Sequence, residues 1–102
     1  MDEIRTIKTA AWTLIKIVEK RWNHIKSAHE NVDTNDNTHF LYKNAIPYAN
    51  IELFKNKIEQ SEDLKELKTV FEQINILNGY CEAHTLVNRL LANSKISNTR
   101  LL

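Results

Sequence analysis

The side chains best suited to chemistry in this sequence are four histidines and one cysteine. The histidines are His24, His29, His39 and His84, and the cysteine is Cys81. His24 and His29 are five residues apart, which separates them by roughly 140° around a helix, whereas the zinc-binding pair of a single helix face is four apart. A metal site that joins His24 or His29 to His84 would need the fold to bring distant segments together. One cysteine excludes an internal disulfide and a zinc site of several thiolates, so the sequence predicts neither a metal nor a cofactor.

Cys81 and His84 are three residues apart, and this spacing allows a thiol–imidazole pair on one helix face. Both residues, however, continue an apolar stripe that runs through Ile74 and Leu77. We therefore expect Cys81 to be a small core side chain rather than a nucleophile.

The segment 83–86, Ala-His-Thr-Leu, resembles the start of the active-site helix of histidine phosphotransfer domains, which are helical bundles of similar size. The resemblance implies that His84 would accept a phosphoryl group, with a lysine three residues and a glycine four residues after it. This chain has Val87 and Asn88 at those positions. Because His84 also continues the apolar stripe, we expect it to face the core without a cation beside it, and we expect no catalytic residue.

Length and composition are typical of one small globular domain. The chain has 102 residues, of which 42% are hydrophobic and 26% charged. One glycine and one proline are too few for the turns of an all-β fold or for a glycine-rich phosphate loop. No apolar run approaches the ~20 residues that span a membrane, and Asp2 and Glu3 are not typical of a secretory signal. We expect a cytoplasmic protein.

Apolar residues at helical spacing predict an all-α fold. The expected architecture is an antiparallel bundle of three long helices, at 2–32, 39–60 and 62–93. We expect residues 1–94 to form a single helical domain and residues 95–102 to form a flexible C-terminal tail. The residues expected to be most deeply buried are Leu14, Val18, Ile51, Phe71 and Ile74.

Two residues leave the number of helices open. Pro47 either kinks one continuous helix over 39–60 or lies in the first turn of a new helix, and the unbroken apolar phase across it favours the kink. Gly79 either ends a helix, which gives a four-helix bundle, or lies within one helix over 62–93. The matching length of the first helix favours three helices. The polar segment 32–37 is expected to be a loop.

The first helix carries the residues that we expect to contact a partner. They are Trp12, Lys16, Lys20, Trp22 and Lys26. Trp12, Ile15 and Trp22 provide more apolar surface than one helix seam needs, so we expect part of it to be exposed in the monomer and covered by a partner. Lys16 and Lys20 lie one turn apart and could instead contact phosphates. Fourteen basic and thirteen acidic residues give a net charge of only +1, however, and nucleic-acid-binding proteins usually carry a clear cationic excess.

These observations predict a small non-catalytic helical module that acts through protein–protein interaction, as an adaptor, an inhibitor or an immunity-type factor. The expected partner is another protein or a second copy in a homodimer, and no membrane contact is expected. Nucleic-acid binding through the basic face of the first helix is the alternative, and phosphotransfer through His84 is a second one. Ile, Lys and Asn make up 33 of the 102 residues. Their A/T-rich codons favour a phage, a plasmid or a low-GC bacterium as the source.

Overall fold

The structure is a computed structural model that describes residues 2–31 and 38–101, with the side chains of Asn31 and of residues 94–101 outside the description. Its elements are α1 (Glu3–Asn31), α2 (His39–Ala45), the 3-10 turn η1 (Ile46–Tyr48), α3 (Ile51–Gln60) and α4 (Leu64–Leu101). The described residues contain helices and connecting turns but no strand, which confirms the predicted all-α class. The predicted loop at 32–37 lies outside the described residues.

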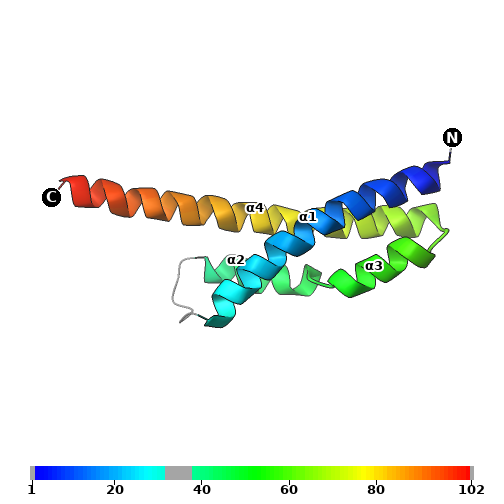
Figure 1. The fold of residues 1–102 in the computed structure, drawn as a ribbon, viewed down its shortest axis with the longest axis horizontal. Helices are drawn as coiled ribbons and strands as arrows, with labels where there is room; N and C mark the ends of the chain where they lie inside the picture. The colour runs from blue at the N-terminus through cyan, green and yellow to red at the C-terminus, as the bar shows by residue number, and fades with distance from the viewer. Residues whose placement is uncertain (1, 32–37, 102) are drawn as a thin grey trace.

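The two long helices, α1 and α4, pack against each other and run in the same direction (Figure 1). Contacts along their length confirm this, because Lys8 meets Glu62, Arg21 meets Asn78 and His29 meets His84. The segment made of α2, η1 and α3 runs back alongside both of them in the opposite direction (Figure 1). The body is elongated, with extents of 61 × 26 × 17 Å, and the C-terminal end of α4 projects beyond the other described helices (Figure 1).

A repeat of three and four residues on each long helix forms the core. The buried residues of α1 are Ala11, Ile15, Val18, Trp22, Ile25 and His29, and those of α4 are Leu67, Val70, Ile74, Leu77, Cys81 and His84. This spacing keeps one stripe of each helix facing the other over several turns. Ala45, Phe54 and Ile58 complete the core from the middle segment.

The predicted buried face of each long helix is correct, but not every residue predicted to be deeply buried is so. Val18 and Ile74 are fully buried, as expected. Leu14, Ile51 and Phe71 are only half-buried and pack at the margin of the core, so their predicted deep burial is wrong. In each long helix a neighbouring residue takes the place in the seam, Ile15 instead of Leu14 and Val70 instead of Phe71.

The middle segment is broken at Pro47 rather than kinked. Helix α2 ends at Ala45, Pro47 lies in the first turn of η1, and the next helix begins only at Ile51. Ala49, with φ −89° and ψ 51°, is outside the helical region. Proline lacks a backbone N–H and its ring crowds the preceding turn, which accounts for the break. The continuous kinked helix over 39–60 is therefore not confirmed, although the apolar phase does carry across the break to Phe54.

Gly79 lies inside α4, and no described glycine has a positive φ. The four-helix alternative, which required Gly79 to end a helix, is therefore wrong. Helix α4 is 38 residues long and runs to Leu101. The backbone of residues 95–101 is thus helical rather than an irregular tail, because Leu91 is followed by no helix-breaking residue. The flexibility of this end remains a prediction.

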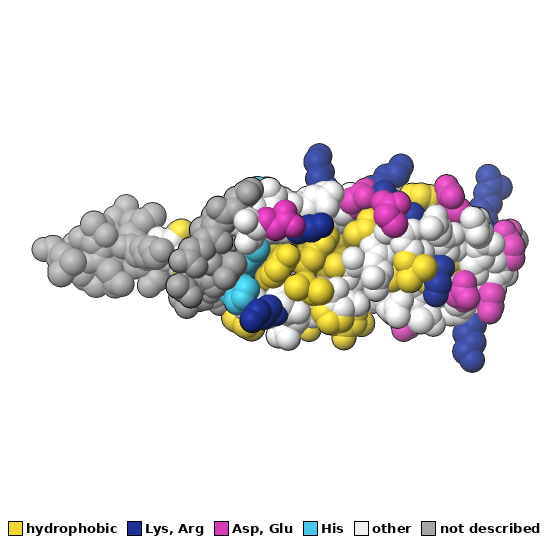
Figure 2. Space-filling model, turned by 90° about the horizontal axis from the view of Figure 1, so that it is seen from below, with side chains coloured by type: hydrophobic (Ala, Val, Ile, Leu, Met, Phe, Trp, Pro, Cys, Tyr) yellow, Lys and Arg dark blue, Asp and Glu magenta, His cyan; other side chains and the backbone are white. Residues whose placement is uncertain are grey.

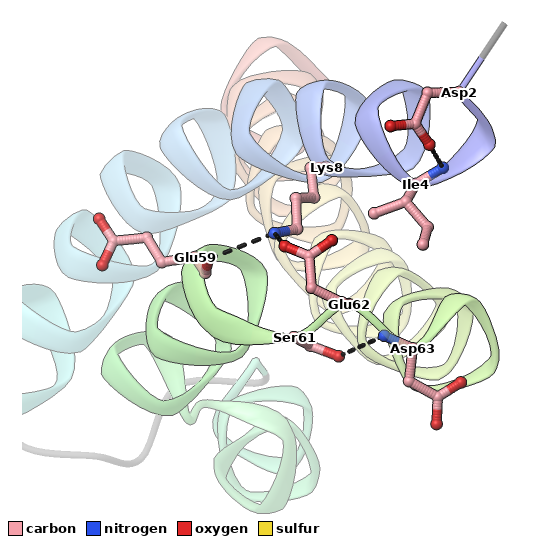
Figure 3. Close-up of polar contacts among 7 residues, drawn as sticks. All are labelled: Asp2, Ile4, Lys8, Glu59, Ser61, Glu62 and Asp63. Atoms are coloured by element: carbon pink, nitrogen blue, oxygen red, sulfur yellow. Dashed lines mark hydrogen bonds and ion pairs between the residues drawn. The ribbon is translucent and has the colours of Figure 1, made fainter.

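Polar contacts fasten the end of the bundle where the chain starts (Figure 3). Lys8 of α1 donates to the backbone carbonyl of Glu59 at 3.2 Å and to Glu62 Oε1 at 2.9 Å. Asp2 Oδ1 accepts a hydrogen bond from the N–H of Ile4 and so caps α1. The Lys8 contacts join α1 to the turn between α3 and α4.

The same turn sets the start of α4. Asp63 Oδ1 accepts from the N–H of Lys65, as an N-cap does, while Ser61 Oγ accepts from the N–H of Asp63 (Figure 3).

An ion pair joins the middle segment to α1. Lys55 of α3 lies 2.6 Å from Glu19 Oε2 of α1. This hydrogen bond and the charge of Glu19 raise the pKa of Lys55 against the opposing effect of desolvation. The middle segment is therefore tied to both long helices.

Candidate functional site

Two adjoining hollows lie where α1 and α4 run side by side. The first, of about 190 Å³, is lined by Arg21, Glu82, Thr85, Leu86 and Arg89. The second is lined by Ile17, Lys20, Arg21, His24, Ile25 and Thr85. Because they share Arg21 and Thr85, the hollows form one continuous surface, which we call the α1–α4 groove.

Helical spacing accounts for the walls of the α1–α4 groove. On α1, Ile17, Arg21 and His24 follow one another at steps of four and three residues. On α4, Glu82, Thr85 and Arg89 do so at steps of three and four. Residues at these steps share a helix face. Each row flanks a buried stripe, so the packing of the two stripes brings the rows together.

A polar network occupies the middle of the groove. Arg21 Nη1 donates to Asn78 Oδ1 at 2.7 Å and to Glu82 Oε1 at 3.3 Å. Asn78 Nδ2 also donates to Glu82 Oε1, at 3.3 Å. Glu82, the acidic residue of the groove, is therefore already paired. In the described part of the chain no ion pair engages Lys20 or Arg89.

Exposed apolar side chains accompany these cations. Ile17 is 45% exposed on the α1 wall and Leu86 is 53% exposed on the α4 wall. A surface that combines exposed aliphatic groups with unpaired cations is suited to a partner that supplies both apolar contact and negative charge.

Three of the histidines meet at the other side of the bundle. His29 Nε2 lies 2.9 Å from His84 Nε2, and both rings are buried. Asn88 Nδ2 lies 3.3 Å from His84 Nδ1. These contacts are satisfied together when Asn88 donates to His84 Nδ1 and the Nε2–H of His84 donates to His29. The ring of Tyr42 stacks on His29 with centroids 4.4 Å apart, and His39 lies 5.8 Å from His29.

This histidine cluster connects α1, α2 and α4 rather than presenting a reactive group. His84 is only 5% exposed, which confirms that it faces the core. A phosphoryl acceptor must be reached by its donor, and the Nε2 of His84 instead contacts His29. Among the residues that the structure describes, no group of three or more histidine, cysteine or carboxylate side chains could hold a metal ion. In the sequence, the only role considered for His29 together with His84 was a metal site, which the sequence does not favour.

Cys81 lies in the core one turn before His84. Burial raises the pKa of its thiol to about 11, the effect of Glu82 adds to the rise, and the charge of Arg21 opposes it. The thiolate is the nucleophilic form of cysteine. A buried thiol with a raised pKa is therefore suited to packing, as the sequence predicts.

The structure separates the five residues predicted to contact a partner. Lys20 lines the α1–α4 groove, and Lys16 shares a different hollow with Trp12, Thr9 and Thr13. Lys26 is exposed outside both. Trp22 is 6% exposed and stacks on Tyr42 with ring centroids 5.3 Å apart.

Of the three apolar residues whose surface was expected to be partly exposed, Ile15 and Trp22 are buried and Trp12 is half-buried. The wide apolar face of α1 is used inside the bundle, where α4 covers one side of it and the middle segment covers the other. The groove residues missed by the sequence prediction are Ile17, Arg21, His24, Leu86 and Arg89. Their i, i+3 and i, i+4 spacing was the available signal, but it does not say that the two rows meet.

A second apolar area lies on the side of α2 and α3. Seen from below the view of Figure 1, hydrophobic side chains gather in the middle of the molecule, with histidine side chains at their edge (Figure 2). The exposed large apolar residues of this middle segment are Phe40, Ile46 and Leu53. The cations Lys43 and Lys57 of the same segment also make no ion pair among the described residues, so this area is a second apolar surface with unpaired cations beside it.

Comparison with protein-family models, curated proteins and solved structures found no match to this chain. No described helix combines the length and the apolar character needed to cross a membrane.

Proposed function

We propose that this protein is a non-catalytic helical interaction module that binds another protein through the α1–α4 groove. The observation that carries the proposal is the combination of exposed Ile17 and Leu86 with the cations Lys20 and Arg89, which make no ion pair among the described residues. An adaptor, an inhibitor or an immunity-type factor would act in this way, by covering a surface of its partner.

Three properties of this surface favour the binding of a partner. Covering the exposed parts of Ile17 and Leu86 contributes about 25 cal/mol for each Å² of apolar surface removed from water. The nearby cations raise the association rate of an acidic partner and select against a basic one. The Arg21–Asn78–Glu82 network holds the walls in place before binding, which reduces the entropy lost on association.

Nucleic-acid binding by the basic face of α1 is the second candidate function. Lys16 and Lys20 are both exposed, and Lys20 lies beside Arg21 and His24. The net charge of +1 and the aliphatic side chains within the groove favour a protein partner over a phosphate backbone. The cytoplasmic location and the phage or plasmid source remain predictions from the sequence.

Site-specific photo-crosslinking in the native cell tests the proposed function. A photoreactive residue at Ile17, which lines the groove, is combined with the double variant Lys20→Glu/Arg89→Glu, and the control is Lys43→Glu/Lys65→Glu, which changes the net charge equally at exposed positions outside the groove. We expect one protein to be crosslinked in the parent and in the control and lost in the groove variant. Equal crosslinking in all three would overturn the proposal. Capture of nucleic acid with a steep loss at higher salt would establish the second candidate instead.

A further inference from the structure

The outer face of α4 carries a row of apolar and small residues that the bundle covers only in part. Tyr80, at the edge of this row, is half-buried and stacks on Tyr48 with ring centroids 5.9 Å apart. The row consists of Ile76, Gly79, Tyr80, Ala83, Leu86, Val87 and Leu90, and we call it the outer stripe of α4. Ile76, Leu86 and Leu90 are 44%, 53% and 57% exposed. They are three of the seven exposed large hydrophobic residues in the described part of the chain. At 100° per residue the centre of this stripe lies about 140° from the buried seam that faces α1.

The stripe repeats the spacing by which α4 already packs on another helix. Ile76, Tyr80, Ala83, Val87 and Leu90 follow one another at steps of four, three, four and three residues. The buried stripe from Leu67 to His84 has the same alternation of steps. Such a repeat keeps two helices in contact over several turns. A partner for this face is therefore a helix.

The stripe is symmetric in sequence about Ala83. Ile76 and Leu90 lie seven residues on either side of it, Gly79 and Val87 four, and Tyr80 and Leu86 three. If a second α4 packs antiparallel with the twofold axis at Ala83, each large side chain meets an apolar or small residue of the other copy. Ile76 then lies against Leu90 of the second copy, and Val87 lies over Gly79. A twofold interface requires this self-complementarity.

No close contact in the described monomer requires a glycine at position 79. It lies in a helix interior, where glycine is unfavourable, its φ is not positive, and a Cβ placed on it would meet no atom within 4 Å. In the antiparallel pair the missing side chain gives room to Val87 of the second copy. None of the seven residues of the stripe is charged, so nothing in it opposes its own burial.

We infer that the outer stripe of α4 is the surface by which two copies of this chain associate, antiparallel and about Ala83. The inference is tested separately from the proposed function, because Ile76, Gly79 and Leu90 take no part in the α1–α4 groove, although Leu86 belongs to both surfaces. One pair of helix faces covers less than the ~800 Å² per partner of a standard stable interface. We therefore expect a dimer that dissociates on dilution through the micromolar range.

Sedimentation equilibrium of the full chain over a range of concentrations measures this association. Ile76→Glu and Leu90→Glu should each weaken it at least tenfold, while Leu53→Glu, at an equally exposed apolar position on α3, should leave it unchanged. Gly79→Leu should also abolish it and should leave the helical circular dichroism and the cooperative melt intact. Ile17→Glu, in the groove, should have no effect on it. A monomer at all concentrations, or a dimer insensitive to Ile76→Glu, would overturn the inference.

Disulfide trapping tests the antiparallel geometry. Ile76→Cys alone should form no intermolecular disulfide, whereas a mixture of Ile76→Cys and Leu90→Cys chains should form the mixed species on oxidation. The native Cys81 is buried and provides no competing exposed thiol. Predominant pairing of Ile76→Cys with itself would mean a parallel dimer and would contradict the proposed arrangement.

Discussion

The buried contact between His29 and His84 joins residues 55 positions apart in the sequence, with the two Nε2 atoms 2.9 Å from each other. It lies at the end of the α1–α4 seam, where the aliphatic core gives way to the rings of Tyr42 and His39. A hydrogen bond between two imidazole nitrogens needs one donor and one acceptor. Each ring therefore depends on the other to satisfy a polar atom that water reaches poorly.

Replacing one ring of this pair should destabilise the fold. In His84→Leu the Nε2 of His29 loses its partner inside the protein, which costs about 1–3 kcal/mol of unfolding free energy. Chemical denaturation measures the loss. His24→Leu, at an exposed histidine of the same helix, should change stability by less than about 0.5 kcal/mol.

The double variant His29→Leu/His84→Leu separates hydrogen bonding from packing. With both polar rings replaced by apolar groups, no unpaired atom remains, so the double variant should be more stable than the sum of the single losses predicts. Strict additivity of the two losses would show that the Nε2–Nε2 contact is not a hydrogen bond.

Cys81 should make stability depend on alkaline pH. Its pKa is raised by burial from 9.0 to about 11 in the folded chain. Between these values the unfolded chain has lost the thiol proton and the folded chain retains it, so unfolding becomes more favourable as pH rises. The loss is absent below about pH 9 and reaches about 2–3 kcal/mol near pH 11.

Lysines and tyrosines also titrate in this alkaline range, so the measurement compares the wild-type chain with Cys81→Ala at each pH. The difference in unfolding free energy between the two should shrink as pH rises from 9 to 11. A constant difference would contradict the assignment. In the same buffers Cys81 should react with a thiol reagent only at the rate at which the bundle opens.

The sequence predicts the helices of this protein well because their apolar spacing is long and regular. The spacing of Ile74, Leu77, Cys81 and His84 defines a single buried face of α4, and the burial of His84 follows from it. At Leu14 and Ile15 the sequence offers two adjacent apolar residues. The choice between them depends on which side of α1 the middle segment occupies, and that is decided by tertiary packing.

The α1–α4 groove was only partly predictable for the same reason. Lys20 stands out as part of a basic face on one helix, but Arg89 joins it only because α1 and α4 run parallel in one particular register. Trp22 was expected to contact a partner but lies in the core. A large aromatic residue at the edge of an apolar stripe is suited equally to a core and to an interface. In this fold Tyr42 covers it.

Two neighbouring residues test which face of α1 is buried. Ile15 is fully buried and Leu14 is half-buried. Ile15→Ala should therefore cost about 2–5 kcal/mol, in the range of buried large-to-small changes, and Leu14→Ala distinctly less. Denaturant unfolding of the two variants measures which of them loses more unfolding free energy. A larger loss in Leu14→Ala would mean that α1 is rotated by one position from the arrangement described.

Gly79 offers the last test, because one substitution probes both α4 and its outer face. A Cβ at this position meets no atom within 4 Å, and the backbone is helical without a positive φ. Gly79→Ala should therefore stabilise the monomer by about 0.5–1 kcal/mol, through the greater helix propensity of alanine and the smaller entropy of its unfolded chain. Thermal melts of the variant and the wild-type chain at the same low concentration measure this gain. A destabilised variant would show that α4 is interrupted at Gly79, since a left-handed backbone accommodates glycine better than alanine.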